Sequence, residues 1–160
     1  MIILCDTRQQ ANKHKTKEQW FADNGIEIIR TKLLCGDYTL PTDQTVSIDT
    51  KKDCGELYNC LIQDHARFTR ELKLAQECGI KLYILTENKD KVTSLDDFIQ
   101  WKNPRIFMWV KKGRIGKPPV DVHILQKTML TMESKYGCKF LFCQPNESAY
   151  IITKLLKGEM

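Results

Sequence analysis

The sequence lacks the long apolar segments that membrane insertion and secretion require. No run of about 18 apolar residues occurs, which excludes a helix that spans a bilayer. The start of the chain, Met1 to Asp6, has no basic region and no extended apolar region, and is typical of a first strand rather than a signal peptide. We therefore expect a protein that is not secreted and has no membrane partner.

Paired cysteines are also absent. The seven cysteines are odd in number and form no Cys-x-x-Cys motif. Cys138 and Cys143 share a predicted strand but have no accompanying pair of histidines with which to hold zinc. A disulfide framework and a structural zinc site are therefore disfavoured, and reduced, mostly buried thiols are expected. Such thiols are typical of the cytoplasm, here of a bacterium or a phage-infected cell.

The composition is that of an ordinary globular domain. Hydrophobic residues make up 42% and charged residues 28% of 160 residues, enough for one domain with an apolar core. The formal net charge of +5 permits binding to a polyanion but does not by itself establish it.

Hydrophobic periodicity and turn residues predict an α/β protein with a central mixed sheet flanked by helices. Residues 102–119 contain three prolines and two glycines and are predicted to form a loop. Strands are expected over 2–5, 26–30, 36–40, 46–51, 80–85 and 138–143, and helices over 16–24, 55–62, 64–78, 94–101, 120–136 and from 147.

An acidic residue and a lysine share one face of the predicted strand 46–51. Because side chains alternate along a strand, Asp49 and Lys51 lie together, while Val46 and Ile48 can face the core. With Asp37, Asp49 supplies two carboxylates for a hard cation such as Mg²⁺, and Lys51 can assist a water nucleophile and offset phosphoryl charge. The alternative is that these are solvated charges of no chemical role.

Two basic groups are candidates for DNA contact. Arg67 and Arg70 lie three residues apart on the predicted helix 64–78, and so on roughly one face. Lys111, Lys112 and Arg114 lie in the predicted loop, where neighbouring glycines would allow close approach to phosphate. Nearby aromatic residues could stack on unpaired bases, anchor the loop to the core or form a subunit contact: Trp101, Phe107 and Trp109. In both groups the alternative is a solvated basic surface.

Five motifs occur in an order that resembles the XPF-type nuclease domain family, of the PD-(D/E)XK, restriction-endonuclease-like superfamily. The resemblance covers about residues 2–87 and is strongest to compact phage and bacterial members. The motifs are Asp6-Thr7-Arg8, Leu34-Cys35-Gly36-Asp37-Tyr38, Ile48-Asp49-Thr50-Lys51, Arg67-Phe68 with Glu71, and Leu85-Thr86-Glu87.

The resemblance implies a restriction-endonuclease-like core and roles for particular residues. Asp37 and Asp49 would bind Mg²⁺, with Mn²⁺ as a substitute, and Lys51 would be the catalytic lysine. Asp6 would be a further acidic group near the metal, and Arg8, like Arg67, would contact phosphate. Residues 1–160 would form a single nuclease domain, with core motifs in 1–90 and the remainder of the domain in 91–160.

The chain departs from the family pattern at three points. Gln9 stands where the family has Glu, and in the Asp49-Thr50-Lys51 triplet Asp49 replaces Glu and Thr50 replaces Arg. The acidic residue expected shortly after the lysine is out of register, since Asp53 comes early and Glu56 late. The acidic shell is therefore thinner than in the family.

The sequence thus predicts a Mg²⁺-dependent endodeoxyribonuclease that hydrolyses phosphodiester bonds. The resemblance suggests branched, flapped or distorted DNA as substrate and a homodimer as a candidate assembly. Two alternatives stay open. One is a catalytically weak nuclease fold that acts in DNA binding or subunit interaction, and the other is an RNA nuclease.

Overall fold

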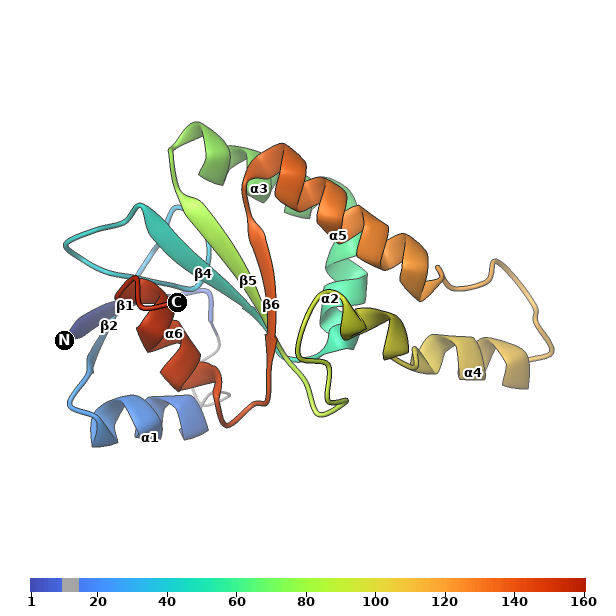
Figure 1. The fold of residues 1–160 in the computed structure, drawn as a ribbon, viewed down its shortest axis with the longest axis horizontal. Coiled ribbons are helices and arrows are strands. Elements are labelled where there is room, and N and C mark those ends of the chain that lie inside the picture. Colours follow the sequence, from blue (N-terminus) through green and yellow to red (C-terminus); the bar gives the residue numbers. More distant parts are fainter. Residues whose placement is uncertain (10–14) are drawn as a thin grey trace.

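A six-stranded mixed sheet forms the centre of the fold in the computed structural model, which describes residues 1–9 and 15–160 (Figure 1). The strand order is β2-β1-β3-β4-β5-β6. The pairs β1/β2, β4/β5 and β5/β6 are parallel, whereas β3 is antiparallel to both neighbours. The bounds are β1 (Ile2–Asp6), β2 (Glu27–Thr31), β3 (Tyr38–Thr39), β4 (Val46–Lys51), β5 (Lys81–Glu87) and β6 (Lys139–Cys143). The predicted central mixed sheet is confirmed.

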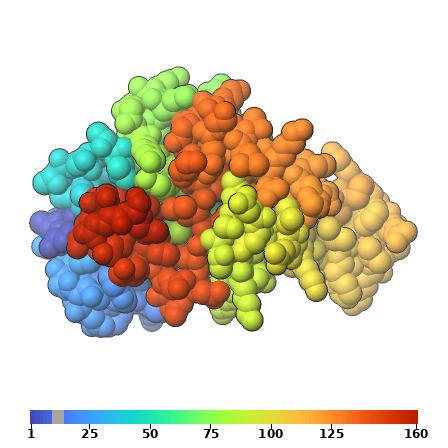
Figure 2. Space-filling model, viewed as in Figure 1, coloured from blue at the N-terminus to red at the C-terminus, as the bar shows by residue number. Residues whose placement is uncertain are grey.

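Helices cover both faces of the sheet. On one face lie α2 (Cys54–Leu61), α3 (His65–Glu77) and α5 (Val122–Tyr136), with the 3-10 helix η1 (Asp97–Gln100). On the other face, α1 (Lys15–Asp23) and α6 (Ser148–Leu156) pack beside each other. The remaining helix, α4 (Pro104–Lys111), projects from the body of the molecule (Figures 1 and 2). Within the described ranges, no helix is long and apolar enough to cross a membrane.

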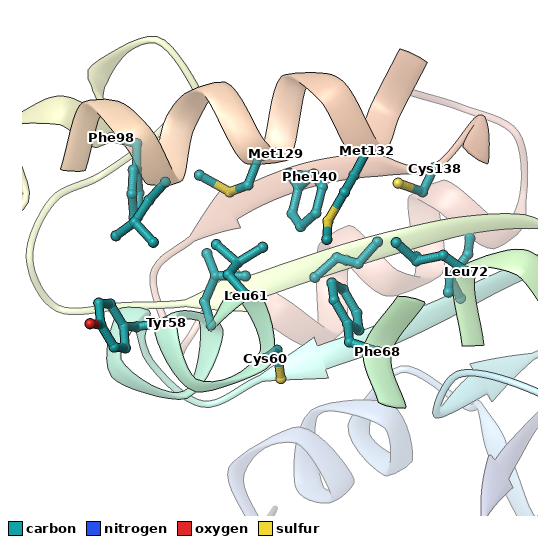
Figure 3. Close-up of a cluster of buried hydrophobic side chains, with 14 of the residues drawn as sticks. Tyr58, Cys60, Leu61, Phe68, Leu72, Phe98, Met129, Met132, Cys138 and Phe140 are labelled. Carbon is teal, nitrogen blue, oxygen red and sulfur yellow. The ribbon is translucent and has the colours of Figure 1, made fainter. Parts of the chain in front are cut away.

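The larger of the two apolar clusters lies between the sheet and the layer of α2, α3 and α5 (Figure 3). The stripe predicted on α3, Phe68, Leu72 and Ala75, is buried in it. Met132 of α5 and Phe140 of β6 pack in the same cluster. Each fully buried side chain of this size contributes about 1.5–3 kcal/mol, so the cluster holds α3 firmly against the sheet.

The prediction of a loop over residues 102–119 is wrong in its first half, because α4 lies there. Pro104 occupies the first turn of that helix, where its missing N–H would have no partner and its fixed φ suits a helix. The Asn103 side chain accepts a hydrogen bond from the Arg105 N–H at 3.1 Å and caps the helix. Proline here starts a helix rather than breaking one.

The expectation that the thiols are mostly buried is confirmed. All seven are free thiols, six of them are buried, and Cys78 is exposed. Burial raises the pKa of both Cys5 and Cys35 to about 11, so both are neutral, apolar parts of the interior.

Candidate active site

A cleft of about 400 Å³ opens where β4 and β5 end. The two strands are parallel, and their register sets Lys51 opposite Thr86, so both deliver their last residues to the same edge of the sheet. Side chains of α2 and α3 complete the walls. The charged groups that line the cleft are the carboxylates of Asp37, Asp49, Glu56, Glu71 and Glu87 and the cations of Arg8, Lys51, Lys52 and Arg67.

Asp49 and Lys51 form an ion pair inside this cleft. Lys51 Nζ lies 2.6 Å from Asp49 Oδ2, and the two residues are only 8% and 6% exposed respectively. Lys51 Nζ also lies 5.5 Å from the centre of the Phe68 ring, which covers it from α3. The alternative of solvated charges on an open strand face is therefore wrong.

Burial and the neighbouring charges together set the protonation of this pair. It raises the pKa of Asp49, an effect that Lys51 opposes and that the nearby carboxylates of Asp37 and Glu71 reinforce. Burial alone would lower the pKa of Lys51, but the groups around it, chiefly the Asp49 carboxylate and also Asp37, together outweigh burial and raise the pKa, so the ammonium form is favoured. Lys51 is thus a positive charge held in a buried part of the cleft.

The backbone around Gly36 positions Asp37 beside this pair. Gly36 has φ of +69°, and a Cβ at this residue would collide with the Ser47 hydroxyl, so the turn requires glycine. The Asp37 N–H donates to the Ile48 carbonyl at 2.7 Å. The Gly36 N–H donates to the Glu71 carboxylate at 3.0 Å, which joins this turn to α3.

Thr50 and Gln9 orient the Asp37 carboxylate. Both the N–H and the hydroxyl of Thr50 donate to Asp37 Oδ2 at 2.7 Å. Gln9 Nε2 donates to the Thr50 hydroxyl at 3.0 Å, and Gln9 Oε1 accepts from the Tyr38 hydroxyl at 3.0 Å. The amide of Gln9 supplies a donor that a carboxylate lacks, so two of the residues that depart from the family pattern, Gln9 and Thr50, form one network.

Asp6 lies behind the cleft and does not line it. Its carboxylate accepts two hydrogen bonds from the Arg8 guanidinium, at 2.8 and 2.9 Å, and two from the backbone N–H groups of Arg8 and Leu33. Burial would raise the pKa of Asp6, but these hydrogen bonds outweigh it and hold the pKa below its usual value. With this set of partners, Asp6 positions Arg8, which does line the cleft.

The donor set suits a hard cation that keeps several waters. The Lys51 ammonium lies close to Asp49 Oδ2 but not at the angles of a hydrogen bond. Asp49 Oδ2 is therefore a buried oxygen without a hydrogen-bond donor among the described residues. Only one oxygen of Asp37, Oδ2, is engaged by Thr50. In the described part of the chain no three His, Cys, Asp or Glu residues gather into a metal site. Two carboxylates nevertheless fit Mg²⁺, which is commonly held by one or two carboxylates plus water.

The two basic groups predicted to contact DNA lie on α3 and around the end of α4, and only one of their residues lines the cleft. Arg67, 71% exposed in its side chain, lines the cleft and lies 3.5 Å from the Asp64 carboxylate. Arg70 is exposed on α3 and does not line the cleft. Lys111, Lys112 and Arg114 lie outside the cleft, at the end of α4 and in the turn that follows.

Glu87 has a different environment from the other acidic residues of the cleft. It accepts a hydrogen bond from the Ser148 hydroxyl at 2.8 Å and forms a buried ion pair with Lys17. Since these three residues belong to β5, α6 and α1, the cluster joins both helices of one layer to the strand that ends in the cleft.

Several cleft residues were given no role from the sequence. Glu71 was named only as part of the fourth motif, although it lies four residues after Arg67, a spacing that puts both on one helix face, and it lines the cleft. The two acidic residues that follow Lys51 out of register, Asp53 and Glu56, also have environments that the sequence did not reveal. Asp53 caps α2 by accepting from the Glu56 N–H, and Glu56 accepts from the Lys52 N–H while lining the cleft.

Comparison with solved structures shows an XPF-type nuclease fold. XPF from Aeropyrum pernix superposes with a TM-score of 0.65 and 16% sequence identity, over 98% of this chain and 64% of that chain. The structure of XPF from Aeropyrum pernix in complex with DNA gives a TM-score of 0.63 and 15% identity, over 98% of this chain and 63% of that chain. This chain therefore spans less than two thirds of the length of those structures. No protein-family model and no curated protein sequence matches it.

Proposed function

We propose that this protein is a Mg²⁺-dependent endodeoxyribonuclease whose active site contains Asp37, Asp49 and Lys51. The observation that carries the proposal is the buried Asp49–Lys51 pair beside Asp37, in a cleft whose exposed charged residues are all cationic. Those residues, Arg8, Lys52 and Arg67, form the rim of the cleft. Burial of an ion pair costs desolvation energy, so the pair is not explained by stability alone, and perturbed ionisable groups in a cleft are characteristic of active sites.

Each group has a role in hydrolysis of a phosphodiester. Asp37, oriented by Thr50, and Asp49 would hold the cation. When bound, Mg²⁺ would supply a Lewis acid that polarises the phosphoryl group. The Lys51 ammonium would orient the attacking water and offset the charge that develops on the phosphoryl oxygens. Arg8 and Arg67, at the rim, would contact the phosphates on either side of the scissile bond.

DNA is the proposed substrate, with branched, flapped or distorted forms as the preferred class. The cationic rim of the cleft and the solved complex of Aeropyrum pernix XPF with DNA support this proposal. A homodimer is proposed as the assembly, and light scattering of the purified protein measures it directly.

The test is cleavage of a labelled panel of linear duplex, flap and four-way DNA, with RNA of the same sequences alongside. We expect Mg²⁺ to support cleavage of DNA, Mn²⁺ to substitute for it, and EDTA to abolish it. Cleavage of RNA in preference to DNA would reassign the enzyme as an RNA nuclease. DNA binding without cleavage in either metal would instead favour a catalytically weak binding module, which the replacement of a family carboxylate by Gln9 motivates.

Thr50→Val should weaken the site without removing a proposed ligand. The valine keeps the backbone donor to Asp37 but removes the hydroxyl that joins Asp37 to Gln9. Loss of such a supporting hydrogen bond typically lowers metal affinity or activity by about 10- to 100-fold. The cleavage rate as a function of Mg²⁺ concentration measures this effect.

The matched control for this variant is Thr131→Val, which removes an exposed hydroxyl on α5 that bonds only to its own helix. It should behave as wild type. An unchanged Mg²⁺ dependence in Thr50→Val would contradict the role given to Thr50.

A further inference from the structure

All the excess positive charge of the chain lies in one projecting segment. Residues 104–117, here called the arm, comprise α4 and the turn after it. The arm contains five Lys or Arg residues and no Asp or Glu, whereas the other 146 residues contain 20 of each sign. The body of the protein is therefore neutral as a whole, and electrostatic attraction to a polyanion is concentrated on the arm.

The arm also exposes apolar side chains. None of the residues of α4 is buried, although most of them are apolar. The exposed large apolar residues of the arm are Ile106, Phe107, Met108, Val110 and Ile115. A helix of eight residues has little stability of its own and normally depends on packing of an apolar face. The arm therefore presents a surface suited to a ligand with both apolar and anionic parts.

The three aromatic residues of this region have different environments. Trp101 is buried in the main core, beside Phe98. Trp109 is half-buried and donates its indole N–H to the Gly116 carbonyl at 3.2 Å, which closes the turn of the arm. Phe107 is 69% exposed. Of the three roles considered for these aromatics, anchoring fits both tryptophans, whereas the exposed ring of Phe107 is available for stacking or for a subunit contact.

The arm is joined to a wall of the cleft. The Arg105 guanidinium stacks on Tyr58 at 4.5 Å and donates to Asn59 Oδ1 at 2.8 Å, both on α2. The same helix contributes Glu56 and Cys60 to the cleft lining. One helix, about 10 Å across, thus separates the arm from the cleft, so a nucleic acid in the cleft could reach both.

We propose that the arm binds unpaired bases of DNA next to the cleft, with Phe107 stacking on a base and Lys111, Lys112 and Arg114 contacting the flanking phosphates. This inference rests on the proposed function in taking DNA as the ligand. A paired duplex offers phosphates but hides its base faces, whereas an unpaired strand offers both to the arm. The competing occupant is a second copy of the chain, whose body carries no net charge to match that of the arm.

Binding to a forked DNA with two unpaired strands, compared with a duplex of the same length, tests this proposal. The measurement is made without divalent cations, and 2-aminopurine at the first unpaired position reports stacking. Phe107→Ala should weaken binding to the fork by about 5- to 100-fold, change binding to the duplex little, and remove the 2-aminopurine quenching. Phe107→Leu should resemble alanine, because it keeps apolarity but has no ring, and Phe107→Trp should retain binding.

Two further variants test the charge of the arm and the location of the exposed aromatic residue. The double variant Lys111→Ala with Lys112→Ala should weaken binding to the fork and to the duplex alike. It should also reduce the steepness of the plot of log binding constant against log salt concentration by about 1 to 2. Tyr150→Ala, which removes an exposed aromatic on α6, should leave both unchanged.

Four results would overturn the proposal. The first is an equal loss of binding to duplex and fork in Phe107→Ala, and the second is full binding to the fork by Phe107→Leu. The third is a change in the molar mass of Phe107→Ala, which would identify a subunit contact. The fourth is loss of binding to phosphatidylserine vesicles in Phe107→Ala with binding to the fork unchanged, which would identify an anionic lipid surface as the ligand. A wild-type protein that prefers the fork but cleaves nothing would refute the nuclease proposal and leave this one standing.

Discussion

Lys51→Ala is expected to reduce Mg²⁺-dependent DNA cleavage by about 10²- to 10⁴-fold. The lysine is held 2.6 Å from Asp49 Oδ2 under the Phe68 ring and is only 8% exposed. A charge fixed in such a place stabilises a transition state far more than the same charge in solvent. Single-turnover cleavage at saturating protein measures the chemical step, and DNA binding measured alongside should change little.

The fold of this variant needs its own control, because the substitution leaves the Asp49 carboxylate buried without its partner. Lys51→Met keeps most of the aliphatic chain under Phe68, so the two variants should be equally inactive even if they differ in melting temperature. Lys157→Ala, on an exposed residue at the end of α6, should cleave like wild type. Cleavage by a folded Lys51→Ala protein at the wild-type rate would remove Lys51 from the mechanism.

Lys17→Met is expected to lower the free energy of unfolding by about 3–5 kcal/mol. Lys17 is 5% exposed and forms an ion pair with Glu87 at the end of β5, where Ser148 also donates to the same carboxylate oxygen. Removing the ammonium leaves a buried carboxylate with only a hydroxyl donor. Urea denaturation followed by circular dichroism measures the change.

The double variant Lys17→Met with Glu87→Gln separates loss of charge pairing from loss of packing. Glutamine keeps an oxygen for Ser148 and carries no charge, so the double variant should recover a large part of the lost stability. Lys15→Met, on an exposed residue of the same helix, should unfold like wild type. A loss below about 1 kcal/mol in Lys17→Met would mean that the pair behaves as a surface ion pair.

The order and type of most elements could be predicted because their signals are local. Alternation in residues 46–51 and the apolar stripe of α3 both correspond to buried faces. The strand order could not be predicted from these signals. The two-residue strand β3 joins β1 to β4 antiparallel, and its pairing depends on residues far apart in the sequence. The helix α4 was missed because Pro104 has opposite meanings at the start and in the interior of a helix.

The site could be predicted as far as its strand residues. Alternation places Asp49 with Lys51, and the structure brings Asp37 to the same cleft. The partners of these residues could not be predicted, because they arrive from other elements. Nothing in the sequence indicates that Gln9 would bond to Thr50 across 41 positions, or that Asp6 would be enclosed by Arg8 and Leu33.

The uneven burial of the thiols has a practical consequence for studying α3. Cys78 follows the last residue of that helix and is exposed, whereas the other six cysteines are shielded within the fold. A maleimide dye will therefore couple preferentially to Cys78 in the folded protein, without any introduced cysteine. Because α3 carries Arg67 and Glu71 into the cleft, the natural chain can carry a fluorescent reporter on the helix that borders its proposed active site.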